Sequence, residues 1–323
     1  MISFIIPYYN ASKTLSRCLD SILQIKNIEY EIILVDDGST DETESIVKKY
    51  SLDNKNIKLI SITHSGVSKS RNVGIISSRG DYICFVDSDD TIDYKFFENN
   101  IDIINVGYDL IVTNMSINAK VESVNFEGKT CVEEFVKSYY PLYRDRMIHL
   151  LHGKIIKRKK LLEDNILFRT NVSIGEDLIF NLDLLMNIDS VFSINDTFYN
   201  YAVSENSVTL KYNDKAIGDS LRMFFSLRRI YKSFNLNEKY LNNIKVKMTY
   251  SIIVNSLRRN SSNGQYNQMK IIKSCILNSK FLKNCEHCKG LSCKFLCFML
   301  FVTPNIVFYL FMKAIFYLKS IQR

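Results

Sequence analysis

Two short apolar runs, each followed directly by acidic residues, constrain the fold of this chain most strongly. The run Glu31–Val35 precedes Asp36-Asp37-Gly38-Ser39-Thr40-Asp41, and the run Tyr82–Val86 precedes Asp87-Ser88-Asp89-Asp90. Apolar runs of this length between turn residues are typical of buried strands. In the segments between these and the neighbouring apolar runs, the apolar residues have the spacing of helices. This alternation of strands and helices predicts an α/β domain with a parallel sheet and right-handed crossovers.

Further elements follow from the same patterns. We expect additional strands at Ile2–Ile6, ended by Pro7, and at Ile57–Ile62, Asp109–Asn114, Val121–Phe126 and Ser190–Tyr201, and helices at Val67–Ser78 and Glu176–Met186. Because ligands of open α/β sheets bind beyond the carboxyl ends of the strands, both acidic clusters are expected in a ligand site.

Charge divides the chain into two parts. Residues 1–215 contain 24 Lys and Arg against 31 Asp and Glu, whereas residues 216–323 contain 18 against three. The second part has helical spacing, and we expect it to form a basic helical extension. With 46% hydrophobic and 24% charged residues, wholesale disorder is excluded, and eight cysteines are too sparse for a disulfide scaffold.

The acidic clusters suit a divalent cation. Mg²⁺ and Mn²⁺ are bound by a few carboxylate oxygens together with substrate phosphates, and an Asp-x-Asp sequence at the mouth of a sheet supplies such oxygens. The alternative is that these aspartates are simple caps and turn residues. No convincing Ser/His/Asp or Cys/His set is present, and four histidines leave little room for a histidine-based metal site.

Five segments resemble family 2 glycosyltransferases in order and spacing. They are Ser3–Asn10, Glu31–Asp41, Gly66–Gly74, Val86–Asp90 and Gly175–Phe180. The resemblance covers about residues 1–215. It implies a GT-A-like, Rossmann-type nucleotide-binding domain and an inverting enzyme. Such an enzyme moves a sugar from a nucleoside diphosphate donor, commonly a UDP-sugar, to a hydroxyl of a glycan or lipid-linked acceptor in surface polysaccharide assembly.

The resemblance also implies roles for single residues. Pro7 and Tyr9 would line the base pocket, Asp37 would hydrogen-bond the base, and Arg71 would lie near the diphosphate. Asp87 would approach the ribose and the metal, Ser88 would belong to the donor site, and Asp89 would ligate Mn²⁺ or Mg²⁺ directly. Asp177 would be the general base, with Glu176 beside it, and His152 and Lys154 would lie in an acceptor or supporting position.

Two other functions share these features. A sugar nucleotidyltransferase on a related fold would normally carry a Gly-rich loop after the first strand, and Pro7-Tyr8-Tyr9-Asn10 is not one. A non-catalytic sugar-nucleotide-binding or scaffold protein would be suggested by the loss of Asp89 or Asp177, and both are present.

The C-terminal part predicts contact with an anionic inner-leaflet membrane. Phe295–Met312 is uncharged, lies between Lys294 and Lys313, and is interrupted by Pro304, which favours an interfacial or re-entrant helix pair over a plain core helix. Nucleic acid is disfavoured because aliphatic residues interleave the basic ones. With no basic segment before the first apolar run, we expect a cytoplasmic enzyme, peripheral or monotopic on the inner membrane. Self-association and the role of Cys285–Cys297, zinc ligands or buried thiols, stay open.

Overall fold

The computed structural model describes residues 1–117, 120–124, 127–139, 146–202, 212–237, 239–258, 262–278 and 304–321. Residue contacts divide the chain into two compact units. The first comprises Met1–Asn171 and Glu176–Ser204, and the second comprises Val172–Gly175 and Glu205–Arg323.

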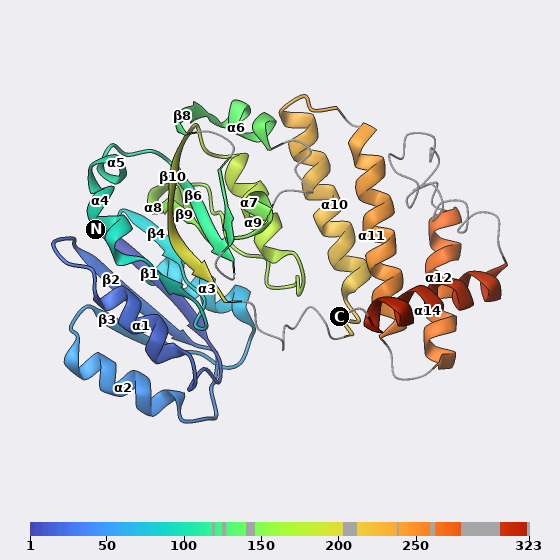
Figure 1. The fold of residues 1–323 in the computed structure, drawn as a ribbon, viewed down its shortest axis with the longest axis horizontal. Coiled ribbons are helices and arrows are strands. Elements are labelled where there is room, and N and C mark those ends of the chain that lie inside the picture. The colour runs from blue at the N-terminus through green and yellow to red at the C-terminus, as the bar shows by residue number, and fades with distance from the viewer. Residues whose placement is uncertain are drawn as a thin grey trace. The chain divides into compact units, whose positions relative to one another are not determined.

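The first unit is built on a mixed sheet with the strand order β3-β2-β1-β4-β9-β6-β10-β5 (Figure 1). The strands are β1 (Ile2–Tyr8), β2 (Tyr30–Asp36), β3 (Ile57–Ser61), β4 (Tyr82–Phe85), β5 (Thr91–Ile92), β6 (Leu110–Ile117), β7 (Lys120–Glu122), β8 (Gly128–Cys131), β9 (Lys154–Lys157) and β10 (Ser190–Tyr201). The strands β1 to β4 are parallel, as predicted. The antiparallel strand β9 joins β4 to β6, which the sequence patterns did not predict.

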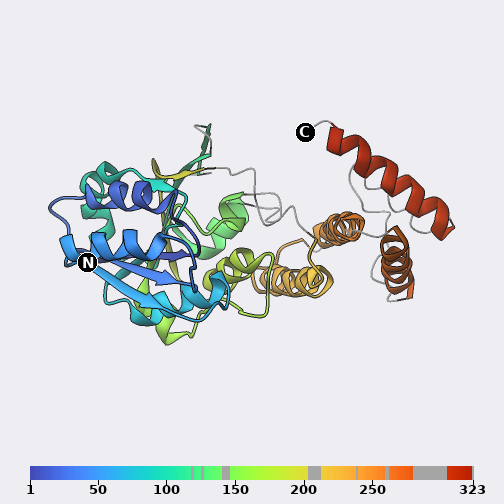
Figure 2. The same ribbon diagram turned by 90° about the horizontal axis from the view of Figure 1, so that it is seen from below.

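Helices cover both faces of this sheet. They are α1 (Leu15–Leu23), α2 (Thr43–Asp53), α3 (Val67–Ser77), α4 (Tyr94–Asn99), α5 (Ile101–Asn105), α6 (Val132–Ser138), α7 (Arg146–His149), α8 (Arg158–Glu163) and α9 (Glu176–Leu185). The buried side chains of α1 and α2 pack with Phe4 and Ile6 of β1 in one apolar core. Figure 2 shows these two helices on one side of the blue strands. The opposite face carries α3.

Pro7 does not end β1, contrary to the prediction, and the strand continues to Tyr8. The ladder explains why proline is tolerated in a central strand. The carbonyl of Ile5 accepts from Val86 of the β4 side, and the carbonyl of Tyr8 accepts from Asp37 of the β2 side. Alternate residues therefore bond to opposite neighbours, so Pro7 faces the β4 side. The pairing of β4 with β1 ends at Ile5, so the missing N–H of Pro7 removes no hydrogen bond from this ladder.

The helix α3 lies unusually close to β1. A Cβ atom on Gly74 would come within 2.3 Å of Cγ2 of Ile5, so only glycine permits this approach. Gly66, with φ of +92°, starts the helix at the carboxyl edge of the sheet. Arg71 follows little more than one turn later, which places its side chain at the edge where ligands of such sheets bind.

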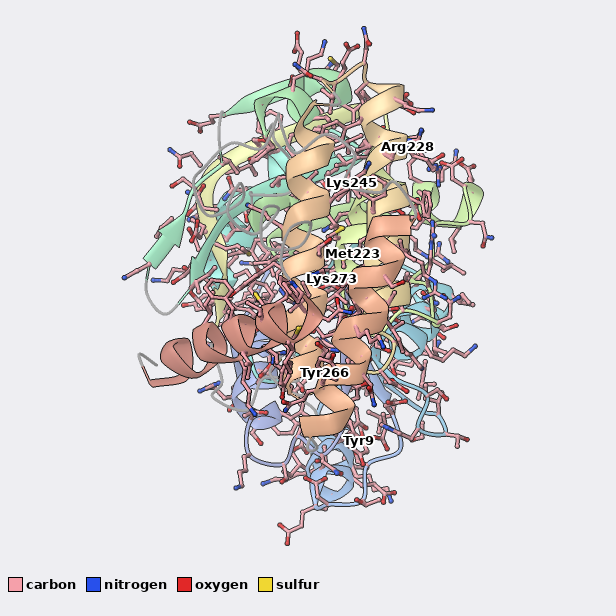
Figure 3. The ribbon with its side chains drawn as sticks, turned by 90° about the vertical axis from the view of Figure 1, so that its right-hand side faces the viewer. Tyr9, Met223, Arg228, Lys245, Tyr266 and Lys273 are labelled. Atoms are coloured by element: carbon pink, nitrogen blue, oxygen red, sulfur yellow. The ribbon has the colours of Figure 1, made fainter. Side chains whose placement is uncertain are left out.

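The second unit is helical, as predicted. Its described helices are α10 (Ala216–Ser233), α11 (Lys239–Leu257), α12 (Ser262–Asn278) and α14 (Asn305–Ile321). Arg228, Lys245 and Lys273 come from three of them (Figure 3). Lys245 and Lys273 lie over the rings of Phe224 and Phe308 at 5.3 and 5.2 Å, so part of the basic charge is used in packing within the unit.

The described part of the uncharged run is amphipathic. Pro304 directly precedes α14, whose Phe308 and Met312 are buried while Ile306, Val307 and Leu310 are exposed. No helix among the described residues is both long and apolar enough to cross a membrane. Residues 295–303 and the cluster Cys285–Cys297 lie outside the described residues.

Candidate active site

A buried arginine joins the acids that follow β4 to the acids that begin α9. Arg71 is 3% exposed, and its Nη2 lies 3.0 Å from Oδ1 of Asp87. Its Nη1 lies 2.7 Å from Oδ1 of Asp177 and 3.9 Å from Oε1 of Glu176. Burial alone would lower the pKa of Arg71, but Asp177 and then Asp87 outweigh it and raise the pKa. One fixed positive charge is therefore shared by three carboxylates.

The guanidinium of Arg71 packs against the ring of Phe168. The carbon Cζ of Arg71 lies 5.2 Å from the centroid of that ring, which in turn stacks on Phe180 of α9 at 4.1 Å. The side-chain amide of Asn72 donates to the carbonyl of Phe168 and accepts from its amide, both at 2.8 Å. The helix α3 and the segment that leads to Asp177 are thus tied together by directional bonds.

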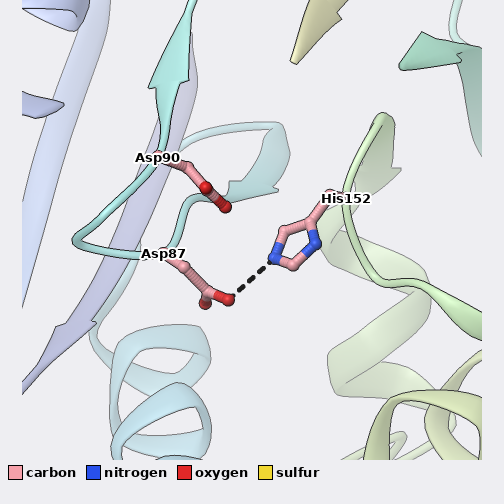
Figure 4. A group of neighbouring side chains, drawn as sticks. All are labelled: Asp87, Asp90 and His152. Carbon is pink, nitrogen blue, oxygen red and sulfur yellow. Dashed lines mark ion pairs between the residues drawn. The ribbon is translucent and has the colours of Figure 1, made fainter. Parts of the chain in front are cut away.

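A second group gathers around Asp87. Oδ2 of Asp87 lies 3.1 Å from Nε2 of the buried His152 (Figure 4). The ring of His152 stacks on Tyr199 at 4.4 Å. The Tyr199 hydroxyl donates to Oδ2 of Asp90 at 2.6 Å and accepts from the amide of Asp87 at 3.1 Å. His152, predicted in an acceptor or supporting position, therefore lies beside Asp87, which was predicted on the donor side.

The electrostatics of this group follow from burial and close pairing. Burial alone would raise the pKa of Asp87, but His152 and Arg71 outweigh it and lower the pKa. Burial alone would lower the pKa of His152, but the attraction of Asp87 outweighs burial, so the pKa of His152 is raised. Burial raises the pKa of Asp90 to about 6, although the Tyr199 hydroxyl and the Ala202 amide favour its charged form.

The oxygens and nitrogen of this group fit a cation. One ligand atom each from Asp87, Asp90 and His152 lies within 4.8 Å of the others, and carboxylate oxygen with imidazole nitrogen is a donor set that Mn²⁺ accepts. Asp89, predicted as the direct ligand, is half-buried and stands outside this group. Arg17 donates to its carbonyl oxygen at 2.7 Å, which fixes the backbone of the loop.

Tyr9 and Asp37 lie at the carboxyl edge of the sheet, directly after β1 and β2. The buried Asp37 accepts hydrogen bonds from the amides of Ser65 and Gly66, which are contributed by the loop before α3. Tyr9 is 47% exposed, and its ring lies 4.5 Å from that of His64. Pro7 is buried beside them in β1, where it pairs with Val35.

The remaining predicted residues have distinct surroundings. Lys154 is buried on β9, and its ammonium donates to the carbonyl of Leu150, which secures the turn that carries His152. Ser88 is half-buried in the loop after β4. Burial, followed by the neighbouring Asp177, raises the pKa of Glu176.

Sequence reasoning gave no role to four residues that shape this edge. They are Arg17, His64, Asp90 and Tyr199. Asp90 belongs to a quoted acidic cluster, and His64 directly precedes the segment that starts with Gly66, so position alone could have marked both. Tyr199 and Arg17 reach the site only through the sheet order and the packing of α1.

This arrangement defines an α/β domain of the GT-A type with a helical part after it. A sequence profile described as glycosyl transferase family 2 matches residues 3–161. Residues 3–161 therefore form a domain of this family, as predicted, and four of the five motifs fall within it.

The relatives agree with this assignment. The Bacillus subtilis glycosyltransferase EpsJ is 28% identical over 219 residues, which are 65% of this chain and 63% of EpsJ. TarS of Staphylococcus aureus, a poly(ribitol-phosphate) beta-N-acetylglucosaminyltransferase, is 31% identical over 182 residues, 54% of this chain and 30% of TarS. This chain thus matches less than two thirds of the length of either relative.

A solved structure shares the fold over nearly the whole chain. The crystal structure of S. aureus TarS 1–349 in complex with UDP-GlcNAc has a TM-score of 0.67 and 19% identity, covering 99% of this chain and 91% of that one. At this identity the likeness concerns the fold alone, and it confirms the predicted GT-A-like architecture.

Proposed function

We propose that this chain is an inverting glycosyltransferase that moves a sugar from a UDP-sugar to a hydroxyl of a glycan or lipid-linked acceptor in surface polysaccharide assembly. The observation that carries the proposal is Arg71, which joins Asp87 of the donor side to Asp177 at the start of α9. The named activity of TarS and its complex with UDP-GlcNAc support this assignment.

The carboxylate of Asp177 takes the proton of the acceptor hydroxyl during the transfer. The acceptor oxygen bonds to the anomeric carbon as the bond from that carbon to the diphosphate oxygen breaks. The electron pair leaves with the diphosphate, and a single displacement inverts the anomeric centre. Arg71 stabilises the charge that develops on the leaving group, because its guanidinium is buried and stays charged.

A divalent cation suits the donor end of the site. When bound, Mn²⁺ or Mg²⁺ neutralises negative charge on the diphosphate. Asp87 and Asp89 are our proposed ligands, and Asp90 and His152 offer further ligand atoms beside Asp87. Pro7, Tyr9, Asp37 and Ser88 complete the donor side, while Glu176 and Lys154 support the acceptor side.

Release of the nucleoside diphosphate tests the function. Full-length protein is incubated with a panel of UDP-sugars and Mn²⁺, with and without a lipid-linked or glycan acceptor. We expect one UDP-sugar to give UDP release that the acceptor accelerates. A protein that binds UDP-sugars but releases no UDP with any acceptor would be a binding or scaffold protein. Release of pyrophosphate from a sugar phosphate and a nucleoside triphosphate would identify a nucleotidyltransferase.

Removing Asp89 should abolish the metal-dependent part of UDP binding. In calorimetric titrations, Mn²⁺ should strengthen UDP binding to the natural protein but not to Asp89→Ala, because the variant lacks the carboxylate that would hold the cation at the donor site. His152→Gln should keep the metal effect if Asp89 is the direct ligand. A metal effect that survives Asp89→Ala but disappears in His152→Gln would move the ligand set to Asp87, Asp90 and His152.

The second unit is proposed to bind an anionic membrane surface. On α10, Ile217, Leu221 and Phe225 are exposed and recur every fourth residue, so they form one apolar stripe. Exposed Arg228 and Lys232 follow on the same helix. On α14, a second exposed apolar group comprises Ile306, Val307 and Leu310. Apolar stripes beside basic residues are typical of helices that lie in a membrane interface.

Replacing the α14 group with serine should weaken vesicle binding. Each side chain contributes about 1 kcal/mol because it is only partly exposed, so the triple variant should bind anionic vesicles about 100-fold less tightly in sedimentation assays. Leu52→Ser, which changes an apolar residue 84% exposed on α2, is the matched control. High salt should release the protein only in part. Unchanged vesicle binding of the triple variant, or none by the natural protein, would contradict the membrane proposal.

A further inference from the structure

The carboxylate of Asp37 is committed to the loop between β3 and α3. Its Oδ1 accepts from the amides of Ser65 and Gly66 at 2.7 and 3.2 Å, and its Oδ2 accepts from the amide of Gly66 at 2.9 Å. The residue is 5% exposed. The predicted direct bond from Asp37 to a base stays a prediction, and the geometry suits this aspartate to shaping the loop.

The same aspartate fixes the hydrogen of the His64 imidazole. Nδ1 of His64 lies 2.9 Å from the carbonyl oxygen of Asp37 and 3.0 Å from its Oδ2. Both neighbours are acceptors, so Nδ1 carries the hydrogen, and Nε2 of the neutral ring is an acceptor. The side chain is 61% exposed, and no hydrogen bond within the described part of the chain engages Nε2.

The position of the imidazole is fixed on two further sides. Tyr9, which follows β1, packs against the ring with 4.5 Å between centroids and 38° between planes. Gly38 lies so close that a Cβ atom there would come within 3.1 Å of the His64 amide nitrogen, and its φ of +78° favours glycine. An exposed acceptor is therefore held in one orientation at the carboxyl edge of β1 to β3.

We infer that His64 selects the donor base by accepting, at Nε2, the N3–H hydrogen of uracil. This inference rests on the proposed function and names the group that recognises its donor. Among pyrimidines, N3 of uracil carries a hydrogen, whereas N3 of cytosine is itself an acceptor. Asp37 holds the ring hydrogen of His64 on Nδ1, so Nε2 is an acceptor. It therefore favours UDP over CDP. Asp37 acts through His64 as a positioning residue.

Calorimetric titration of the full chain with UDP and with CDP, both with Mn²⁺, tests this inference. His64→Phe keeps a ring against Tyr9 but has no acceptor. We expect its affinity for UDP to fall about three- to tenfold, the effect of one exposed hydrogen bond, while its affinity for CDP is unchanged. His64→Ala should show the same loss of preference. Thr63→Ala, an exposed neighbour on the same loop, should keep the preference of the natural protein.

The outcomes separate the inference from the proposed function. A natural protein that prefers UDP, together with His64 variants that do not, supports the inference. A preference that survives both His64 variants overturns it and leaves the proposed function standing, as does a natural protein that binds CDP as tightly as UDP. A natural protein that binds neither nucleotide overturns the proposed function and the inference with it. Thermal unfolding of each variant checks that the fold is kept.

Discussion

Asp177→Asn should slow sugar transfer by about 10²–10⁴-fold while leaving UDP binding intact, because the variant keeps the shape of the side chain but cannot take a proton. The amide oxygen can still accept from Nη1 of Arg71, which lies 2.7 Å from Oδ1 in the natural protein. The site therefore keeps its geometry while it loses its base. Initial rates of acceptor-dependent UDP release give the turnover, and calorimetric titration gives the affinity for UDP.

Asp183→Asn is the matched control for this substitution. Asp183 lies on the same helix α9 and pairs with Arg169 at 2.9 Å, so the control also removes one carboxylate charge beside an arginine. Its turnover should stay within about twofold of the natural protein, because surface pairs contribute little and no reacting group is changed. Turnover of Asp177→Asn equal to that of Asp183→Asn would place the base elsewhere, and Glu176, with its raised pKa, would be the next candidate.

The sequence was sufficient for the parallel half of the sheet because its signals there are local. The strands β1 to β4 each combine an apolar run with turn residues, and β10 was predicted with its observed bounds. Pro7 misled the prediction, since local propensity marks a proline as a strand end, whereas its tolerance depends on which neighbour its backbone faces. The antiparallel β9 escaped prediction because Lys154–Lys157 is short, and its pairing with β4 and β6 is non-local.

Residues of the candidate site could be singled out from the sequence where each lies within a local motif. Asp87 and Arg71 were identified in separate motifs, and the structure brings them within 3.0 Å of each other. The contact between Asp87 and His152 depends on β9 lying beside β4, so spacing along the chain carries no signal for it. Tyr199 reaches Asp90 in the same way, through the placement of β10.

Arg71→Met should destabilise the first unit and also impair transfer, because it leaves three carboxylates without their shared cation. Asp87, Asp177 and Glu176 keep only 29%, 20% and 19% exposure of their side chains, so water compensates incompletely. Removing one partner of a buried ion pair costs about 3–5 kcal/mol, and the partial exposure of these acids favours a loss of about 3 kcal/mol at pH 7. Turnover should fall by about 10²–10³-fold, as for other groups that stabilise charge in the transition state.

Urea unfolding followed by circular dichroism measures the loss, with Arg169→Met as the control. Arg169 also pairs with an aspartate of α9, but it is 37% exposed and its removal leaves one carboxylate unpaired instead of three, so it should cost less than Arg71→Met. Combining Arg71→Met with Asp177→Asn removes one of the carboxylate charges that Arg71→Met leaves unpaired. The double variant should therefore recover part of the lost stability. If it is no more stable than Arg71→Met alone, the loss comes from the contact of the guanidinium with Phe168, and the shared charge is not what holds these acids together.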